Sequence, residues 1–277
     1  MKNQNIKTKN KLKIVITSGD ESGVGPEVIL KALFSEKIPK NIEITLVGSK
    51  KHFESTFQNL KNIGIKNIVD PNNFEIFDMH ESTYFEKNKK HYGEDSFNYL
   101  KKGIEIVQKD QNSALVTGPI CKKSWSLAGH NYSGQTELLA ETCEVKNVGM
   151  LFTAKSPITN WRFNTLLAST HIPLSEVPKK LNSSLIQSKL DLLLNFCCKY
   201  TKNPILKVAG LNPHAGEEGM LGNEEKDWLN DAIINWRKLN KGIEIFGPLS
   251  PDTCWSSSAK AWSHRDSLKH DGILAMY

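Results

Sequence analysis

KIVITSGDESGVGPE, residues 13–27, places an apolar run, three glycines and a proline in an order that decides the fold. The run Lys13–Thr17 predicts a strand, and the glycines after it indicate a tight turn. Gly25 and Pro26 mark the start of a helix, because proline suits the first helical turn, where its missing N–H leaves no hydrogen bond unmade. A strand that turns sharply into a helix is the first half of an α/β crossover unit.

The rest of the chain repeats this alternation of short apolar runs and longer amphipathic runs. The expected strands are Lys13–Thr17, Ile42–Val47, Ala114–Val116, Gly149–Phe152, Thr165–Ala168, Ile205–Ala209, Ile243–Phe246 and Gly272–Tyr277. The expected helices are Pro26–Phe34, Gly93–Gln108, Thr136–Cys143, Ser184–Tyr200 and Glu224–Leu239. Between them, Asp70–Lys90 is polar and irregular, as in a surface excursion or part of a second domain. The pattern predicts an α/β fold class with a mostly parallel sheet and flanking helices.

Charge and length bound the class of protein. The 277 residues carry a formal charge of +6, but residues 1–13 hold five lysines and no acid. We therefore expect a solvated, disordered basic tail over residues 1–12 and a nearly neutral remainder. No second basic block with interleaved aromatic residues follows, so we expect no nucleic-acid partner.

The cysteines and the apolar runs indicate a cellular setting. The five cysteines form no C-x-x-C pair and leave an odd count, which argues against a disulfide framework and a zinc finger. No apolar stretch approaches the length of a membrane span, and no apolar core follows the N-terminal lysines as in a secretory signal. We therefore expect a cytoplasmic protein without a membrane partner.

Two stretches combine glycines with a helix start. Gly19, Gly23 and Gly25 follow the first strand with the spacing G-x-x-x-G-x-G, which is not the dinucleotide fingerprint. Free N–H groups at such a helix start suit an anion, although a purely structural turn explains the pattern equally well. In the second stretch, Lys122 precedes SGQTE, residues 133–137, which can cradle a phosphate or carboxylate. Helix capping by Ser133 or Thr136 is the alternative interpretation there.

Two of the eight histidines follow apolar strands. His171 and His214 each lie just past a strand's carboxyl end, where ligand sites gather in parallel sheets. Imidazoles from neighbouring strand ends could share a divalent cation, but catalytic zinc normally has three protein ligands. From these residues alone, hydrogen-bonded structural histidines are the favoured interpretation. The other six histidines lie in polar stretches and are expected at the surface: His52, His80, His91, His130, His264 and His270. The acids Glu217, Glu218, Glu224 and Glu225 are expected in a solvated loop and helix start.

Several motifs together resemble a known enzyme family. VITSGDESGVGPEVILKAL, LVTGPICK, SGQTELLAE, LASTHIPLSEV, GLNPHAGEEG, GPLSPDT and DGILAMY follow one another in the order found in 4-hydroxythreonine-4-phosphate dehydrogenases of vitamin B6 biosynthesis. The resemblance runs from about Lys13 to the last residue. GLNPHAGE and TGPI-x-K are its more specific motifs.

This resemblance implies a homodimeric enzyme, related in fold to isocitrate and isopropylmalate dehydrogenases, with its active site at the dimer interface. Residues 13–277 would form one catalytic unit of two intertwined α/β subdomains. The implied reaction is NAD-dependent oxidation and decarboxylation of 4-phosphooxy-L-threonine to 3-amino-2-oxopropyl phosphate, and NADP remains an alternative cofactor. By resemblance, His171 and His214 bind a divalent metal (Zn, Mg, Mn or Co), Gln135 and Thr136 bind substrate, and Asp252 is an acid near the reaction centre.

The sequence also departs from the family pattern. Many members have histidine at the position of Gln135. Family members continue past LAMY with a His-Asp-Gln-Gly loop that supplies a third metal histidine, so the resemblance implies a chain truncated after Tyr277 and inactive as it stands. Two alternatives remain: a non-catalytic remnant that binds a phosphate ligand or a partner subunit, and a related decarboxylating dehydrogenase of another phosphorylated hydroxy acid.

Overall fold

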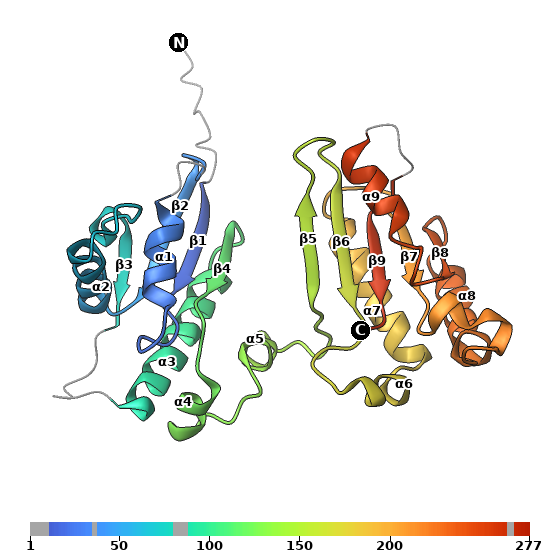
Figure 1. Cartoon of the computed structure of the whole chain (residues 1–277), viewed down its shortest axis with the longest axis horizontal. Coiled ribbons are helices and arrows are strands. Elements are labelled where there is room, and N and C mark those ends of the chain that lie inside the picture. The colour runs from blue at the N-terminus through green and yellow to red at the C-terminus, as the bar shows by residue number, and fades with distance from the viewer. Residues whose placement is uncertain (1–10, 35–37, 80–87, 265–268) are drawn as a thin grey trace, which may run out of the picture. The chain divides into compact units, whose positions relative to one another are not determined.

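The computed structural model describes residues 11–34, 38–79, 88–264 and 269–277 (Figure 1). It divides into two compact units, Met1–Val145 and Lys146–Tyr277, each with its own sheet. Most of the expected basic tail, and His80, lie outside the described residues.

The first unit holds a four-stranded parallel sheet in the order β3-β2-β1-β4. Its strands are β1 (Leu12–Thr17), β2 (Ile42–Gly48), β3 (Glu75–Asp78) and β4 (Ser113–Thr117). Its helices are α1 (Gly25–Leu33), α2 (Lys50–Asn62), α3 (Lys89–Gln108), α4 (Lys122–Leu127) and α5 (Gln135–Thr142). The sequence did not predict α2, α4 or β3, and β3 lies inside the segment expected to be irregular.

Side chains alternate along β1 and β2, so that both faces of this first sheet carry buried apolar residues. Ile16 and Leu46 point to one face, where they pack with Leu30 of α1 and Phe53 of α2. Val15 and Val47 point to the other face and pack against Tyr99 of α3. Strands buried on both faces are expected in a parallel sheet, and they explain the continuous apolar runs of the sequence.

The second unit holds a five-stranded sheet in the order β5-β6-β9-β7-β8, in which β5 alone runs antiparallel to its neighbour. Its strands are β5 (Leu151–Lys155), β6 (Arg162–Leu167), β7 (Ile205–Ala209), β8 (Glu244–Leu249) and β9 (Gly272–Ala275). Its helices are α6 (Val177–Lys180), α7 (Ser183–Cys197), α8 (Asn230–Leu239) and α9 (Ser256–Ser263). The expected α/β fold with a mostly parallel sheet and flanking helices is confirmed.

One face of this second sheet carries the larger core. Leu206 and Val208 of β7 and Leu274 of β9 are fully buried against α7 and α8. On the opposite face α9 is tied to the chain around β5 and β6, because the carbonyls of Ala261 and Trp262 accept hydrogen bonds from Thr159 and Ser156.

Candidate functional site

The carboxyl ends of β1 and β4 are joined by backbone contacts that need glycine. The N–H of Asp20 donates to the Pro119 carbonyl at 2.9 Å, and the N–H of Gly118 donates to the Thr17 carbonyl at 2.9 Å. Gly19 has a φ of 74°, and a Cβ there would lie 2.3 Å from the Pro119 oxygen. The first glycine turn is therefore a close-packed junction between two strand ends.

The same junction holds acidic groups that the sequence analysis did not single out. Asp20 is 4% exposed and its Oδ1 accepts bonds from the N–H and the hydroxyl of Ser22. Its Oδ2 and the Ser18 hydroxyl are buried and have no hydrogen-bond partner among the described residues. Such orphaned polar atoms next to a strand end mark a place where a ligand or an ordered water can bind. The one feature of the sequence that could have identified Ser18 and Asp20 is that they are polar residues directly after a buried strand.

Gln135 is built into this end of the first unit. Its Nε2 donates to the Gly118 carbonyl at 2.9 Å, so the start of α5 is tied to the turn after β4. No side chain caps α5, whose N-cap is Gly134, and the predicted capping by Ser133 or Thr136 is therefore wrong. Thr136 is exposed, and the Lys122 side chain passes beside Gly134, where an added Cβ would lie 3.7 Å from its Cε.

In the second unit, His214 lies in an unusual loop after β7. Five consecutive residues from His214 to Glu218 have left-handed backbone angles, within the helical turns of Pro213–Gly219. Such angles are costly for residues with a Cβ and persist only where surroundings hold them. Glu225, which is 3% exposed, helps to stabilise the loop in this conformation. Its carboxylate accepts bonds from the N–H groups of Leu211 and Asn212 at 2.7 and 2.8 Å.

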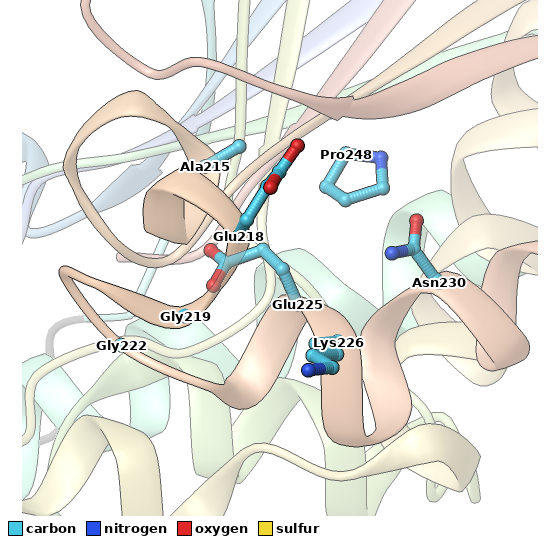
Figure 2. A pocket seen from close by; sticks show the side chains of 8 residues that line it. All are labelled: Ala215, Glu218, Gly219, Gly222, Glu225, Lys226, Asn230 and Pro248. Carbon is cyan, nitrogen blue, oxygen red and sulfur yellow. The ribbon is translucent and has the colours of Figure 1, made fainter.

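Glu225 was expected in a solvated region, and that expectation is wrong. Its carboxylate is buried because it accepts hydrogen bonds from the backbone N–H groups of Leu211 and Asn212, in place of backbone carbonyl groups. It also lines a pocket of 470 Å³ between this loop and the start of α8. Figure 2 shows Glu218 on the loop side of the pocket, and Glu225 and Asn230 on the helical segment that faces it.

Asp252 lies next to His214. Its Oδ2 accepts a bond from the His214 N–H at 3.0 Å and from the Ser250 hydroxyl at 2.9 Å, and it lies 3.4 Å from His214 Nδ1. These two hydrogen bonds, with that from His214 the stronger, lower the pKa of the Asp252 carboxyl. A carboxylate beside Nδ1 is the usual arrangement that leaves Nε2 of a histidine available to a metal.

His171 is placed by the pairing of β6 with β9. Beyond the strand ends, Ser169 continues this pairing by donating from its N–H and its hydroxyl to the Met276 carbonyl. His171 is exposed, with a φ of 56°, and its ring bonds to no described residue. The strands that carry His171 and His214 are not neighbours, because β9 lies between them.

The expectation of neighbouring strand ends is therefore corrected. Two strand spacings separate the two backbones by about 10 Å. A cation shared by both rings would lie over the carboxyl end of β9. Among the described residues, no group of three or more His, Cys, Asp or Glu side chains gathers as a metal site. The two imidazoles fit a metal as a partial donor set, because both side chains are exposed and the Asp252 carboxylate lies beside Nδ1 of His214.

The remaining histidines differ in burial. His270 was expected at the surface, but it is 1% exposed, so that expectation is wrong. His130 is partly buried and stacks on the Phe97 ring with 3.6 Å between ring centroids. In the described part of the chain, no helix has both the length and the apolar character needed to cross a bilayer.

Comparisons with known proteins agree with this architecture. A family model described as pyridoxal phosphate biosynthetic protein PdxA matches residues 40–277. A 4-hydroxythreonine-4-phosphate dehydrogenase from Synechococcus sp. (strain RCC307) is 40% identical over 269 residues, which cover 96% of this chain and 81% of that protein.

Solved structures with matching folds extend the comparison. A 4-hydroxythreonine-4-phosphate dehydrogenase from Klebsiella pneumoniae superposes with a TM-score of 0.78 at 24% identity, covering 96% of this chain and 80% of that one. The corresponding protein from Burkholderia phymatum superposes with a TM-score of 0.74 at 26% identity, with the same coverage of 96% and 80%. The chain belongs to the PdxA family of pyridoxal phosphate biosynthetic proteins, a family of oxidoreductases.

Proposed function

We propose that this chain carries the site for the NAD-dependent and metal-dependent oxidation and decarboxylation of 4-phosphooxy-L-threonine to 3-amino-2-oxopropyl phosphate. The alternative is the inactive remnant that binds a phosphate ligand or a partner subunit. The observation that carries the proposal is the pairing of Asp252 with His214 at a strand end, in a chain that is 40% identical to a protein named for that substrate. The product would enter pyridoxal phosphate biosynthesis.

The residues of the second unit have distinct parts in this proposal. His171 and His214 would hold a divalent cation, Zn, Mg, Mn or Co, which when bound would act as a Lewis acid on the substrate alcohol and on the carbonyl formed from it. Neutral imidazoles suit this purpose because they supply lone pairs without cancelling the positive charge of the metal. Asp252 would hold the His214 ring in the tautomer that carries the proton on Nδ1, and would thereby orient Nε2.

The residues of the first unit would bind substrate. Gln135 offers its amide oxygen, because the amide nitrogen is already bonded to the Gly118 carbonyl. Thr136 offers an exposed hydroxyl and N–H in the first turn of α5, where the helix dipole favours an anionic group. NAD would accept the hydride, and the protein would contribute orientation and electrostatics.

Two further properties belong to the same proposal. We propose a homodimer, on the strength of the family resemblance, and sedimentation velocity would distinguish it from a monomer. We also propose a cytoplasmic location, since all five cysteines are free thiols, as a reducing compartment would leave them.

The direct test is NADH formation from 4-phosphooxy-L-threonine. The chain is first stripped with a chelator and then supplied with each of the four metals in turn. Activity should appear only after metal is restored, and His214→Ala and His171→Ala should abolish it. Absence of turnover with every one of the four metals supports the inactive remnant instead. Asp252→Asn should lower metal affinity or activity by about 10- to 100-fold, as loss of a group that orients a metal ligand usually does.

The matched control is His52→Ala, on α2 of the first unit, whose ring bonds to no described residue. It should retain the activity and the metal affinity of the unaltered chain. Turnover that is insensitive to chelation, or equal in His52→Ala and His214→Ala, contradicts the assignment of the metal site. Turnover of a different phosphorylated hydroxy acid in preference to 4-phosphooxy-L-threonine contradicts the assignment of the substrate.

A further inference from the structure

A second polar cavity lies in the second unit, between β7, β8 and the start of α9. Its volume is 490 Å³. We call it the α9 hollow. The polar side chains that line it are Lys207, Ser250, Thr253, Ser256, Ser257 and Lys260. Its lining residues include two lysines and several hydroxyl groups, and no Asp or Glu is among them.

Lys207 occupies a central strand, where a charged residue requires an explanation. The alternation along β7 buries Leu206 and Val208 under α7 and α8, so Lys207 extends from the opposite face of the sheet. Its Nζ donates to the Ser257 hydroxyl at 2.5 Å. Burial lowers the pKa of this ammonium, and among the described residues it forms no ion pair. A half-buried cation that has only a neutral partner is stabilised when an anion binds beside it.

Lys260 and the hydroxyls complete the same side of the hollow. Lys260 follows Ser256 and Ser257 by four and three positions on α9, so all three side chains share one helix face. Lys260 forms no ion pair with any described residue. The Asp252 carboxylate borders the hollow, because it accepts a hydrogen bond from the hydroxyl of Ser250, a lining residue, and it also accepts from the His214 N–H. Ser250 is therefore not among the groups that we expect to bind an anion.

We propose that the α9 hollow binds a phosphate group, held by the ammonium groups of Lys207 and Lys260 and by the hydroxyls of Ser256 and Ser257. A doubly charged oxyanion matches two lysines that act as point charges, and hydroxyl donors supply the remaining hydrogen bonds. This site lies in the second unit, whereas Gln135 and Thr136 lie in the first. It does not depend on the dehydrogenase activity proposed above.

The test uses inorganic phosphate as the probe and the full chain as the receptor, with binding measured by isothermal titration at constant ionic strength. We expect saturable binding. Lys207→Gln and Lys260→Gln should each weaken it by about tenfold or more, the loss usual for a hydrogen bond between charged groups. Lys238→Gln is the matched control, since it removes the same charge from an exposed site on α8, which packs on the opposite face.

Absence of saturable binding overturns the proposal, and so does equal affinity in Lys260→Gln and Lys238→Gln. Lys260 is exposed, so its variant stays informative if Lys207→Gln fails to fold. A separate readout is the NMR titration of the Lys207 ammonium, whose pKa should rise when phosphate binds. Competition by NAD or by 4-phosphooxy-L-threonine would name the molecule that carries the phosphate, and competition by neither would indicate free phosphate.

Discussion

His270 should make the stability of the second unit depend on pH. Its side chain is 1% exposed, its Nε2 lies 3.2 Å from the Ser258 hydroxyl, and its Nδ1 has no partner among the described residues. The Trp161 ring packs across it at 5.1 Å between centroids. Burial, with a smaller contribution from the positive charge of Lys207, lowers its pKa from 6.5 to about 4.

The sign of the effect follows from proton binding in the two states. Between about pH 4 and pH 6.5 the unfolded chain protonates this imidazole and the folded chain does not. The unfolded state therefore binds more protons, and stability falls as the pH is lowered. The difference between the pKa of 6.5 in the unfolded chain and about 4 in the folded chain corresponds to about 3 kcal/mol of unfolding free energy. Of this, about 2 kcal/mol is lost between pH 7 and pH 5.

The assay is urea unfolding of the chain and of His270→Gln over this pH range. Glutamine can still bond to Ser258 but does not titrate. Tryptophan fluorescence is a suitable signal, because five of the six tryptophans lie in residues 146–277. Burial raises the pKa of Asp271, which gives an opposing trend at lower pH, but that contribution is present in both proteins and cancels in the difference. Equal pH dependence of the two proteins, or an NMR titration of His270 near 6.5, refutes the reasoning.

Three further substitutions test the packing. Gly25→Ala should prevent the first turn from closing, because its Cβ would lie 2.2 Å from the backbone carbonyl oxygen of Ser18. Loss of the native circular dichroism spectrum or a lowered melting temperature would show this effect. Tyr99→Phe removes a 2.8 Å hydrogen bond to buried Glu21 and should cost about 1–3 kcal/mol in urea unfolding. Leu190→Ala opens a cavity under the second sheet at a residue that is 0% exposed, and calorimetry should show a loss of about 2–5 kcal/mol.

Much of the fold could be predicted because its signals are local. The apolar run at Ile205–Ala209 matches β7 at both ends, and the Gly-Pro signal located α1 within one residue. The strand β3 was missed because Glu75–Asp78 is a short, mostly exposed edge strand, whose two apolar residues, Ile76 and Phe77, are adjacent and so do not alternate with polar ones. The helix α2 was missed for a related reason, since only Phe53 and Leu60 are buried along its length.

The candidate site could be predicted only in part. The position of His171 and His214 after strands drew attention to them, but their assignment as metal ligands, like that of Asp252 as an acid near the reaction centre, came from the family resemblance and stays a prediction. The buried roles of Glu225 and His270 had no local signal, because each side chain is buried by segments distant in sequence. The contact between Lys207 and Ser257 in the α9 hollow could not be predicted either, since the two residues are 50 positions apart.

The sequence by itself determined most of the strands and the longer amphipathic helices, since periodicity and turn residues act between near neighbours along the chain. Only the tertiary structure decided that β9, late in the chain, pairs between β6 and β7 and separates the strands of the two candidate metal histidines. It also decided which polar side chains are buried. Both outcomes depend on hydrogen bonds and packing between segments far apart in sequence, which no local pattern specifies.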